Sequence, residues 1–382
     1  MRISIWRCPA IFAVAGLTSA SAQPFTALLN YNRRIFELEL SGRVVTGTGQ
    51  AAGFTELDHA KRQFLNKLGI DTWPGTLNVR LDDADSLSGW RDLRNGDGIG
   101  IHAPDGNNCH ARSYPVQINN QLTGAIIFPE VNGYPDNQVE VIAPLSLRRH
   151  FSLNDGDSLR LNVLAPVRTS AVLFDLDGTL VDTVDAFYQL AKQTGAEFGL
   201  EVSRERMYET LNHGISYWDH VVPESMEDRP AMIKKLNSRA MELWPELIKD
   251  NAGAFSGVVE TLSSLKIAGF ALGIVTGSGE WSLDLLFGLG VADMFDAVVT
   301  GYDVKKRKPD PEGLNKCLKH MDVAPGDAVY VGDSVIDMQA SHAAGVLPLA
   351  VLTGAGTSAS LCEAGAYRIV RSHEQVRALL AT

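Results

Sequence analysis

Hydrophobic positions follow a short alternating rhythm in the first part of the chain. Between about Leu38 and Pro166 the apolar runs are brief, and turns rich in Gly, Asn and Asp separate them. The strand-like runs are 43–46, 77–81, 125–128, 139–142 and 159–163. From Glu56 to Leu68 apolar residues instead recur every three or four positions, which predicts one helix. We therefore predict a small, closed, all-β barrel with one helix.

The second part of the chain has a different pattern. Ala171–Phe174 is a fully apolar run that is too short for a helix, and 274–275 and 329–331 are similar runs. Each is followed at once by polar residues. About 90 residues separate the end of the first motif at Leu180 from the second run at Ile274, more than one crossover helix needs, and from Asp182 to Leu247 the apolar spacing is helical. These features predict an α/β domain with ligands at the carboxyl edge of its sheet.

Polar residues that can bind a metal ion or act in catalysis stand at these strand ends. Asp175 and Asp177 follow the first strand, where paired acids hold Mg²⁺ or supply a nucleophile and a proton donor. The ordered set then continues with Thr276, Lys308, Asp333 and Asp337. An isolated Asp-x-Asp-Gly would also fit an acidic loop after a strand, but the four ordered motifs favour a catalytic site.

This order of motifs resembles the haloacid dehalogenase superfamily of phosphohydrolases over residues 170–382. The resemblance implies a Rossmann-like parallel sheet. It also implies that Asp175 is the nucleophile, Asp177 the general acid and base, and Lys308 the neutralising cation. Thr276 would bind the phosphoryl oxygens. Mg²⁺ would be held by Asp175, Asp333 and the Asp177 carbonyl, with Asp337 nearby. Because Asp177 is present, a phosphatase is favoured over a dehalogenase.

The same resemblance implies an inserted α-helical cap at about 185–250, which would exclude water and choose a small phosphate ester as substrate. His213–Ser216 is a candidate specificity loop, although His213 alone fits an ordinary surface histidine. Lys305, Lys306 and Arg307 fit a solvated basic loop.

A second set of motifs lies in the first part of the chain, over 38–166. The segments Gly47–Gly53, Trp73–Val79, Asn132–Tyr134, Val139–Arg148 and Leu153–Asp157 occur in an order that resembles the archaeal-type CTP-dependent riboflavin kinases. That resemblance implies a cradle-like barrel that makes FMN from riboflavin and CTP. Its implied nucleotide-binding residues are Gly47, Thr48, Gly49, Gln50, Ala51, Ala52, Leu145, Ser146, Leu147 and Arg148. Thr76 and Asn78 would bind Mg²⁺, and Asn132 and Glu140 the flavin.

The physical chemistry of these segments suits phosphate transfer. A glycine-rich loop lets backbone N–H groups approach phosphates, and two residues at i and i+2 of a strand share one face. The P-loop motif G-x-x-x-x-G-K-[ST] is absent from the sequence, which excludes an ordinary P-loop kinase. Ala51 and Asn132 depart from the family pattern. The alternative is therefore a phosphatase of small phosphometabolites, such as phosphoglycolate, a sugar phosphate or FMN, whose barrel binds nucleotide or flavin as a sensor without turnover.

Charge, cysteine spacing and the first residues of the chain limit the partners and the location that we expect. The net charge of −11 argues against nucleic acid as a main partner, and no apolar run is long enough to span a membrane. The four cysteines are scattered, without a C-x-x-C pair. Residues 1–22 resemble a signal peptide or an over-extended start. We expect a cytoplasmic protein because a kinase needs a nucleotide pool, with a periplasmic or secreted phosphatase as the alternative.

Overall fold

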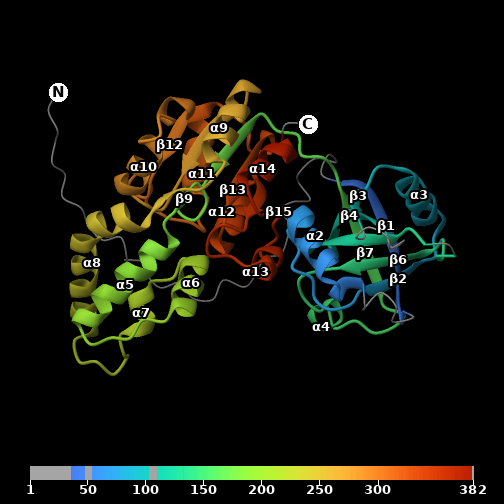
Figure 1. Cartoon of the computed structure of the whole chain (residues 1–382), viewed down its shortest axis with the longest axis horizontal. Helices are drawn as coiled ribbons and strands as arrows, with labels where there is room; N and C mark the ends of the chain where they lie inside the picture. Colours follow the sequence, from blue (N-terminus) through green and yellow to red (C-terminus); the bar gives the residue numbers. More distant parts are fainter. Residues whose placement is uncertain (1–35, 48–53, 103–109, 132, 381–382) are drawn as a thin grey trace.

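The computed structural model describes residues 36–47, 54–102, 110–131 and 133–380. Figure 1 shows the barrel at one end, the α/β domain beside it, and a group of cap helices below the α/β domain. This confirms the predicted fold class, an all-β barrel joined to an α/β domain with an inserted helical cap. None of the helices in these ranges combines the length and the apolar character that crossing a bilayer requires.

Among the described residues, seven antiparallel strands form the sheet of the N-terminal domain. They are β1 (Phe36–Val45), β2 (Leu77–Leu81), β3 (Ile99–Ile101), β4 (Ala111–Ile118), β5 (Leu122–Pro129), β6 (Gln138–Ile142) and β7 (Ser158–Leu164). Their order is β3-β4-β5-β6-β2-β1-β7, and an additional pairing of β4 with β7 closes six of them into a ring. Closure removes open sheet edges, so the short predicted strands are stabilised as a barrel. Helices α2 (Asp58–Leu68), α3 (Ala84–Asn95) and α4 (Leu147–His150) accompany the ring.

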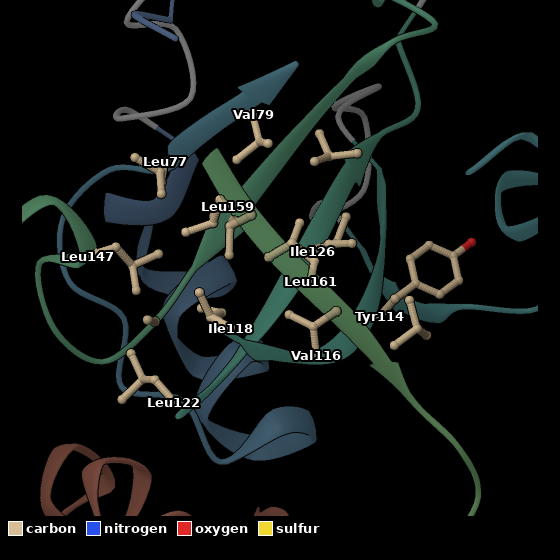
Figure 2. Close-up of a cluster of buried hydrophobic side chains, with 14 of the residues drawn as sticks. Leu77, Val79, Tyr114, Val116, Ile118, Leu122, Ile126, Leu147, Leu159 and Leu161 are labelled. Atoms are coloured by element: carbon tan, nitrogen blue, oxygen red, sulfur yellow. The ribbon is translucent and has the colours of Figure 1, made fainter. Parts of the chain in front are cut away.

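Alternation along the strands fills the barrel. On β7, Leu159 and Leu161 are buried while Ser158 and Arg160 are exposed, which is the two-residue period of a half-buried strand. Figure 2 shows Leu159 and Leu161 among apolar side chains from neighbouring strands. The helix predicted at 56–68 is α2. The pattern missed helix α3, whose Trp90 packs edge-on against the Phe128 ring with 5.7 Å between the ring centroids.

The α/β domain is built on a six-stranded parallel sheet with order β12-β11-β8-β13-β14-β15. Its strands are β8 (Ala171–Phe174), β11 (Ala271–Val275), β12 (Ala297–Val299), β13 (Ala328–Gly332), β14 (Leu347–Val351) and β15 (Arg368–Val370). Its helices are α9 (Val258–Ile267), α10 (Glu280–Phe287), α11 (Glu312–Met321), α12 (Val335–Ala344), α13 (Ser358–Glu363) and α14 (His373–Leu380), with short turns η2 (Ala292–Met294) and η3 (Pro325–Asp327).

The cap leaves and re-enters this domain through a two-stranded ribbon. Strand β9 (Val181–Asp182) pairs antiparallel with β10 (Gly253–Ala254). Between them lie the cap helices α5 (Val184–Glu197), α6 (Arg204–His213), α7 (Tyr217–Val221) and α8 (Arg229–Asn251). Helices α5 and α8 pack together, and Phe187 stacks on Trp244 with 4.6 Å between the ring centroids. The cap is therefore a packed unit on a narrow double connection.

The barrel and the α/β domain share a packed boundary at α13. Ser358 Oγ of α13 donates a hydrogen bond of 2.6 Å to the Gly69 carbonyl after α2. The Cys362 thiol donates to the Thr123 carbonyl of β5. Leu361 and Cys362 belong to the same buried cluster as the barrel core. The two domains are thus joined by side-chain packing as well as by the chain itself.

Candidate active sites

Three neighbouring strands bring the acidic motifs of the α/β domain to one edge. Asp175 follows β8, Thr276 follows β11, and Asp333 follows β13. These strands are adjacent and parallel, with β8 in the middle, so their carboxyl ends meet. All three side chains are buried. The structure therefore gathers residues that are far apart in sequence, as the strand-end pattern predicted.

Lys308 lies at the centre of this group. Its Nζ donates to Asp175 Oδ1 and to Asp337 Oδ1, both at 2.6 Å, and to the Tyr330 hydroxyl at 3.0 Å. Burial disfavours its ammonium, but the Asp175 and Asp337 carboxylates outweigh that effect and raise the pKa of Lys308 well above its usual range. Lys308 is thus a fixed cation beside the expected nucleophile.

Asp333 is held on the other side of the group. Its Oδ1 accepts from the Thr179 hydroxyl at 3.0 Å, and its Oδ2 accepts from the Ala355 N–H at 2.8 Å. A Cβ at Gly354 would overlap the Asp333 carboxylate, so the backbone approach there requires glycine. Burial and the nearby Asp337 carboxylate raise the pKa of Asp333 to about 7.

The charge of this group fits a divalent cation. Asp175, Asp333 and Asp337 place one carboxylate oxygen each within 4.8 Å of one another, and all three are buried. Lys308 is the cation that contacts two of them, so the group carries an excess of negative charge away from water. Burial raises the pKa of Asp175 well above its usual range despite the Lys308 ammonium. Hard oxygen ligands with uncompensated charge are what Mg²⁺ requires.

Asp337 and Asp177 take different places around this cluster. Asp337 Oδ2 accepts from the Ser334 N–H at 3.0 Å and from its hydroxyl, so Asp337 caps helix α12 while it contacts Lys308. The Asp177 carboxylate is outside the cluster and accepts at Oδ1 from Thr183 at 2.8 Å and Ser282 at 2.7 Å. These bonds orient a carboxylate toward the start of the cap.

The cap closes this edge into a cavity of about 210 Å³. Asp175, Asp177, Thr276 and Lys308 line its core side, and the four cap helices line the other side. His213 is exposed, whereas Gly214, Ile215 and Ser216 of the expected specificity loop line the cavity. Lys305 and Lys306 are exposed, but Arg307 also lines the cavity, which differs from our expectation of a wholly solvated loop.

The barrel gathers its own group of predicted residues. Asn78 pairs with Glu140 across β2 and β6 and with Val45 across β1 and β2. The Thr76 hydroxyl donates to Glu140 Oε2 at 3.2 Å. A Cβ at Gly47 would overlap the Asn78 side chain, which places the start of the glycine-rich segment against β2. Burial raises the pKa of Glu140, although the Thr76 hydrogen bond opposes this shift.

The segment predicted to hold the nucleotide is tied to the same end of the barrel. Arg148 donates to the Val45 carbonyl at 3.2 Å and to Asp155 Oδ1 at 2.7 Å. The Thr46 hydroxyl donates to the other oxygen of Asp155 at 2.5 Å. Leu147 is buried in the barrel core, and Leu145 and Ser146 lie beside it in the turn before α4. The predicted residues outside the described ranges are Thr48, Gly49, Gln50, Ala51, Ala52 and Asn132.

Several polar residues in these sites escaped the sequence reasoning. Gln138 donates to Asn78 Oδ1 at 2.7 Å, and the Tyr134 hydroxyl donates to Glu140 at 3.3 Å. Gln138 and Glu140 are two residues apart on one strand face, so the period of two could have indicated Gln138. Tyr330, which contacts Lys308, is a hydroxyl-bearing residue inside an otherwise aliphatic strand, and that contrast was a usable signal.

Comparisons with known proteins agree with this division of the chain. Residues 172–351 match the family described as haloacid dehalogenase-like hydrolase. Residues 44–163 match a model labelled as a CTP-dependent riboflavin kinase and described as a domain of unknown function, DUF120. Each match lies within one of the two domains, which have separate sheets.

Individual relatives show the same split. Phosphoglycolate phosphatase of Thiobacillus denitrificans is 32% identical over 185 residues, which are 47% of this chain and 82% of that protein. Pyrophosphatase PpaX of Bacillus velezensis is 34% identical over 188 residues, 47% of this chain and 81% of that protein. Riboflavin kinase of Methanocella arvoryzae is 36% identical over 132 residues, 32% of this chain, and the match spans only 56% of that kinase. The chain belongs to the haloacid dehalogenase-like hydrolase family, and its N-terminal barrel is similar to the riboflavin kinases.

Proposed function

We propose that the chain is a bifunctional enzyme with a Mg²⁺-dependent phosphatase in the α/β domain and a CTP-dependent riboflavin kinase in the barrel. The observation that carries the phosphatase is the buried contact of Lys308 with both Asp175 and Asp337, beside Asp333. A fixed cation and an excess of buried carboxylates suit the binding of a phosphate dianion together with a metal.

The hydrolysis would proceed through an aspartyl-phosphate. A carboxylate oxygen of Asp175 attacks phosphorus, and the bond from phosphorus to the leaving alkoxide oxygen breaks. Asp177 gives its proton to that alkoxide and then takes a proton from the attacking water. Water oxygen bonds to phosphorus, the bond to Asp175 breaks, and inorganic phosphate leaves. Lys308 offsets the charge on the phosphoryl oxygens, and Thr276 donates a hydrogen bond to them.

Mg²⁺, when bound, would supply Lewis-acid stabilisation of the phosphoryl charge. Asp175 and Asp333 would hold it with the backbone carbonyl of Asp177, and Asp337 would keep Lys308 in place. The excess of buried negative charge supports this assignment.

For the barrel, the kinase is supported by the convergence of Thr76, Asn78, Glu140 and Gly47 at one end. Thr76 and Asn78 would hold Mg²⁺ with the nucleotide phosphates, and Glu140 would face the flavin. The segment 145–148 would hold the cytidine. The riboflavin 5′-hydroxyl oxygen bonds to the γ-phosphorus of CTP, CDP leaves, and the hydroxyl proton passes to solvent or to a nearby base.

The test is a kinase assay on the whole chain carrying Asp175→Asn, so that the phosphatase cannot erase the product. Riboflavin and Mg²⁺ are supplied with CTP or ATP in parallel, and FMN is followed by chromatography. We expect FMN with CTP and not with ATP. Thr76→Ala combined with Asn78→Ala should abolish FMN formation, while these changes in the otherwise native chain should leave phosphate release intact.

The second candidate is a sensor barrel that binds nucleotide or flavin without turnover. It is favoured by the departures from the family pattern at Ala51 and Asn132, two residues that lie outside the described ranges. Absence of FMN with both nucleotides, together with saturable binding of riboflavin or CTP, would establish the sensor and refute the kinase.

A further inference from the structure

Helix α6 of the cap docks on the core at the edge of the phosphatase cavity. Its Asn212 is buried, and Asn212 Oδ1 accepts a hydrogen bond of 2.9 Å from the Val335 N–H at the start of α12. Asn212 Nδ2 donates to Ser360 Oγ of α13 at 3.2 Å. One side chain of the cap therefore bridges two helices of the α/β domain.

The Val335 N–H needs an acceptor from outside its own helix. The first N–H groups of an α-helix have no intrahelical partner. At the start of α12 the Ser334 side chain accepts from the Asp337 N–H, so Ser334 caps a different amide. The acceptor for Val335 comes from the cap. If the cap moved away from the core, the Val335 N–H and the Asn212 amide would both lose their partners, so these bonds favour the docked position.

The bridge lies where the two walls of the cavity meet. Gly214, Ile215 and Ser216 follow Asn212 closely and line the cavity from the cap, and Ile336, next to Val335, lines it from the core. A Cβ at Gly214 would lie 2.9 Å from Ile336 Cδ1, so the two walls touch here. The position of Asn212 thus sets how the cap wall lies relative to the core groups.

Both helices that Asn212 contacts are fixed by bonds of their own. Asp337 of α12 accepts from Lys308 Nζ at 2.6 Å, which joins that helix to the carboxylate cluster. Helix α13 is bonded to the barrel through Ser358 and Cys362. The bridge therefore ties the cap to the catalytic edge of the sheet and to the helix that the barrel holds.

We propose that Asn212 is a positioning residue of the phosphatase. It holds the cap docked over the cavity, so that the cap wall contacts the leaving group while Asp175 attacks phosphorus. This inference rests on the phosphatase proposed above. The groups expected to bind the phosphoryl oxygens, Lys308 and Thr276, line the core side of the cavity. Loss of the bridge should therefore lower turnover of an ester and leave the binding of inorganic phosphate unchanged.

The experiment compares the native chain with Asn212→Leu, which has a similar volume and lacks both hydrogen bonds. In Mg²⁺ we measure kcat/KM for p-nitrophenyl phosphate and the inhibition constant of inorganic phosphate against it. The kcat/KM should fall at least about tenfold, the effect of two neutral hydrogen bonds. The inhibition constant should stay at its native value. An equal loss of phosphate affinity overturns the proposal, because the damage then includes the core.

Asn237→Leu is the matched control. Asn237 is an asparagine of the cap helix α8, it is not among the cavity residues, and its Oδ1 has no partner in the described part of the chain. This change should alter neither constant. A loss of kcat/KM as large as that of Asn212→Leu overturns the specific role of Asn212.

Ser360→Ala tests the second hydrogen bond of the bridge. It should lower kcat/KM by roughly fivefold, the effect of one neutral hydrogen bond. Ser360 Oγ also accepts from the Thr357 N–H at the start of α13, so a double-mutant cycle is needed to isolate the bridge. In the Asn212→Leu chain, Ser360→Ala should cause no further loss of kcat/KM, because its partner is already missing. Losses that multiply fully overturn the contact between the two side chains.

Hydrogen exchange at the start of α12 gives a readout that does not depend on activity. The Val335 N–H should exchange faster in the Asn212→Leu chain than in the native and Asn237→Leu chains. Equal exchange in all three overturns the proposal. Lack of ester hydrolysis by the native chain overturns the phosphatase instead, and the exchange comparison then still decides whether Asn212 docks the cap.

Discussion

Replacing Asp175 by asparagine should remove turnover and at the same time stabilise the metal-free protein. The substitution keeps the shape of the side chain and removes one of three buried carboxylates that lie within 4.8 Å of one another. Asparagine cannot attack phosphorus as a carboxylate does. It can still accept a hydrogen bond from Lys308.

The size of the stability change follows from the contacts of Asp175. At an effective dielectric constant of about 20, its 2.6 Å contact with Lys308 is worth roughly 6 kcal/mol. Each carboxylate pair within 4.8 Å costs at least roughly 3.5 kcal/mol on the same scale. The repulsions of Asp175 by Asp333 and by Asp337 together cancel its attraction to Lys308. The free-energy cost of burying the Asp175 charge is then not compensated. The gain cannot exceed the cost of protonating an aspartate at pH 7, roughly 4 kcal/mol, so we expect about 2 kcal/mol.

Two measurements check this prediction. Phosphate release should fall at least about a thousandfold because the nucleophile is missing. In EDTA the melting temperature of the Asp175→Asn chain should exceed that of the native chain by about 4–8 °C, since 1 kcal/mol shifts Tm by roughly 2–4 °C in a domain of this size. Added Mg²⁺ should raise the Tm of the native chain more than that of the variant, because the variant lacks one anionic ligand.

A remote change of the same charge provides the control. Asp293→Asn, at an exposed position of η2, should alter neither turnover nor the Mg²⁺ effect. The reasoning is refuted if Asp175→Asn keeps turnover near the native level. It is also refuted if the variant melts below the native chain in EDTA and gains as much from Mg²⁺.

Three further predictions concern other parts of the molecule. Gly47→Ala should abolish FMN formation in the kinase assay, because the added Cβ would overlap and displace Asn78. His342→Gln should reduce the loss in free energy of unfolding that occurs as the pH falls below 6.5. Burial lowers the pKa of His342 to about 4, so its contribution is complete above pH 6.5 and is lost as the pH falls from 6.5 toward 4, roughly 2 kcal/mol between pH 7 and 5 by chemical denaturation. Gly69→Ala should destabilise the chain by at least about 2 kcal/mol in thermal melting, because Gly69 has a φ of +69° and a Cβ would overlap the Ile369 carbonyl.

Each of these has a comparison that isolates its cause. Gly47→Ala must leave phosphate release unchanged, or the damage is general. If the His342→Gln chain loses as much unfolding free energy between pH 7 and pH 5 as the native chain does, titration of His342 is unimportant and the prediction is wrong. Gly75→Ala also has a positive φ, of +94°, but nothing within 4 Å of the new Cβ. Gly75→Ala should lower the free energy of unfolding clearly less than Gly69→Ala does. Equal losses would show that the contact between Gly69 and the Ile369 carbonyl of the α/β domain contributes nothing.

The local spacing of apolar residues was enough to predict the fold class correctly. The run Leu77–Leu81 and the periodic helix after Glu56 were readable because burial imposes a period of two or of 3.6 on apolar residues. Helix α3 was missed although Leu87, Trp90 and Leu93 recur every three residues, because its Ser, Asp and Gly residues have low helix propensity. Strand β4 was missed because Arg112 and Pro115 interrupt its apolar run.

Site residues could be predicted from the sequence where they directly follow a strand of the parallel sheet. Asp175 and Asp333 could be placed at one sheet edge because parallel strands share a direction. Tyr217 and Trp218, which line the cavity, gave no comparable signal, because their place in its wall comes from the packing of the cap helices. The contact of Ser358 with Gly69 joins residues far apart in sequence, and no local pattern specifies such a pair.

The packing of α13 between the domains has a consequence for how this fusion can change over generations. Separation of the two domains, as when one is produced without the other, would expose Leu361, Cys362 and Ile369, which are buried in one cluster with barrel residues. Either domain produced alone would expose an apolar surface patch and would tend to aggregate. A lineage that needs only one of the two active sites is therefore expected to inactivate the other by single substitutions and to retain its full-length shell.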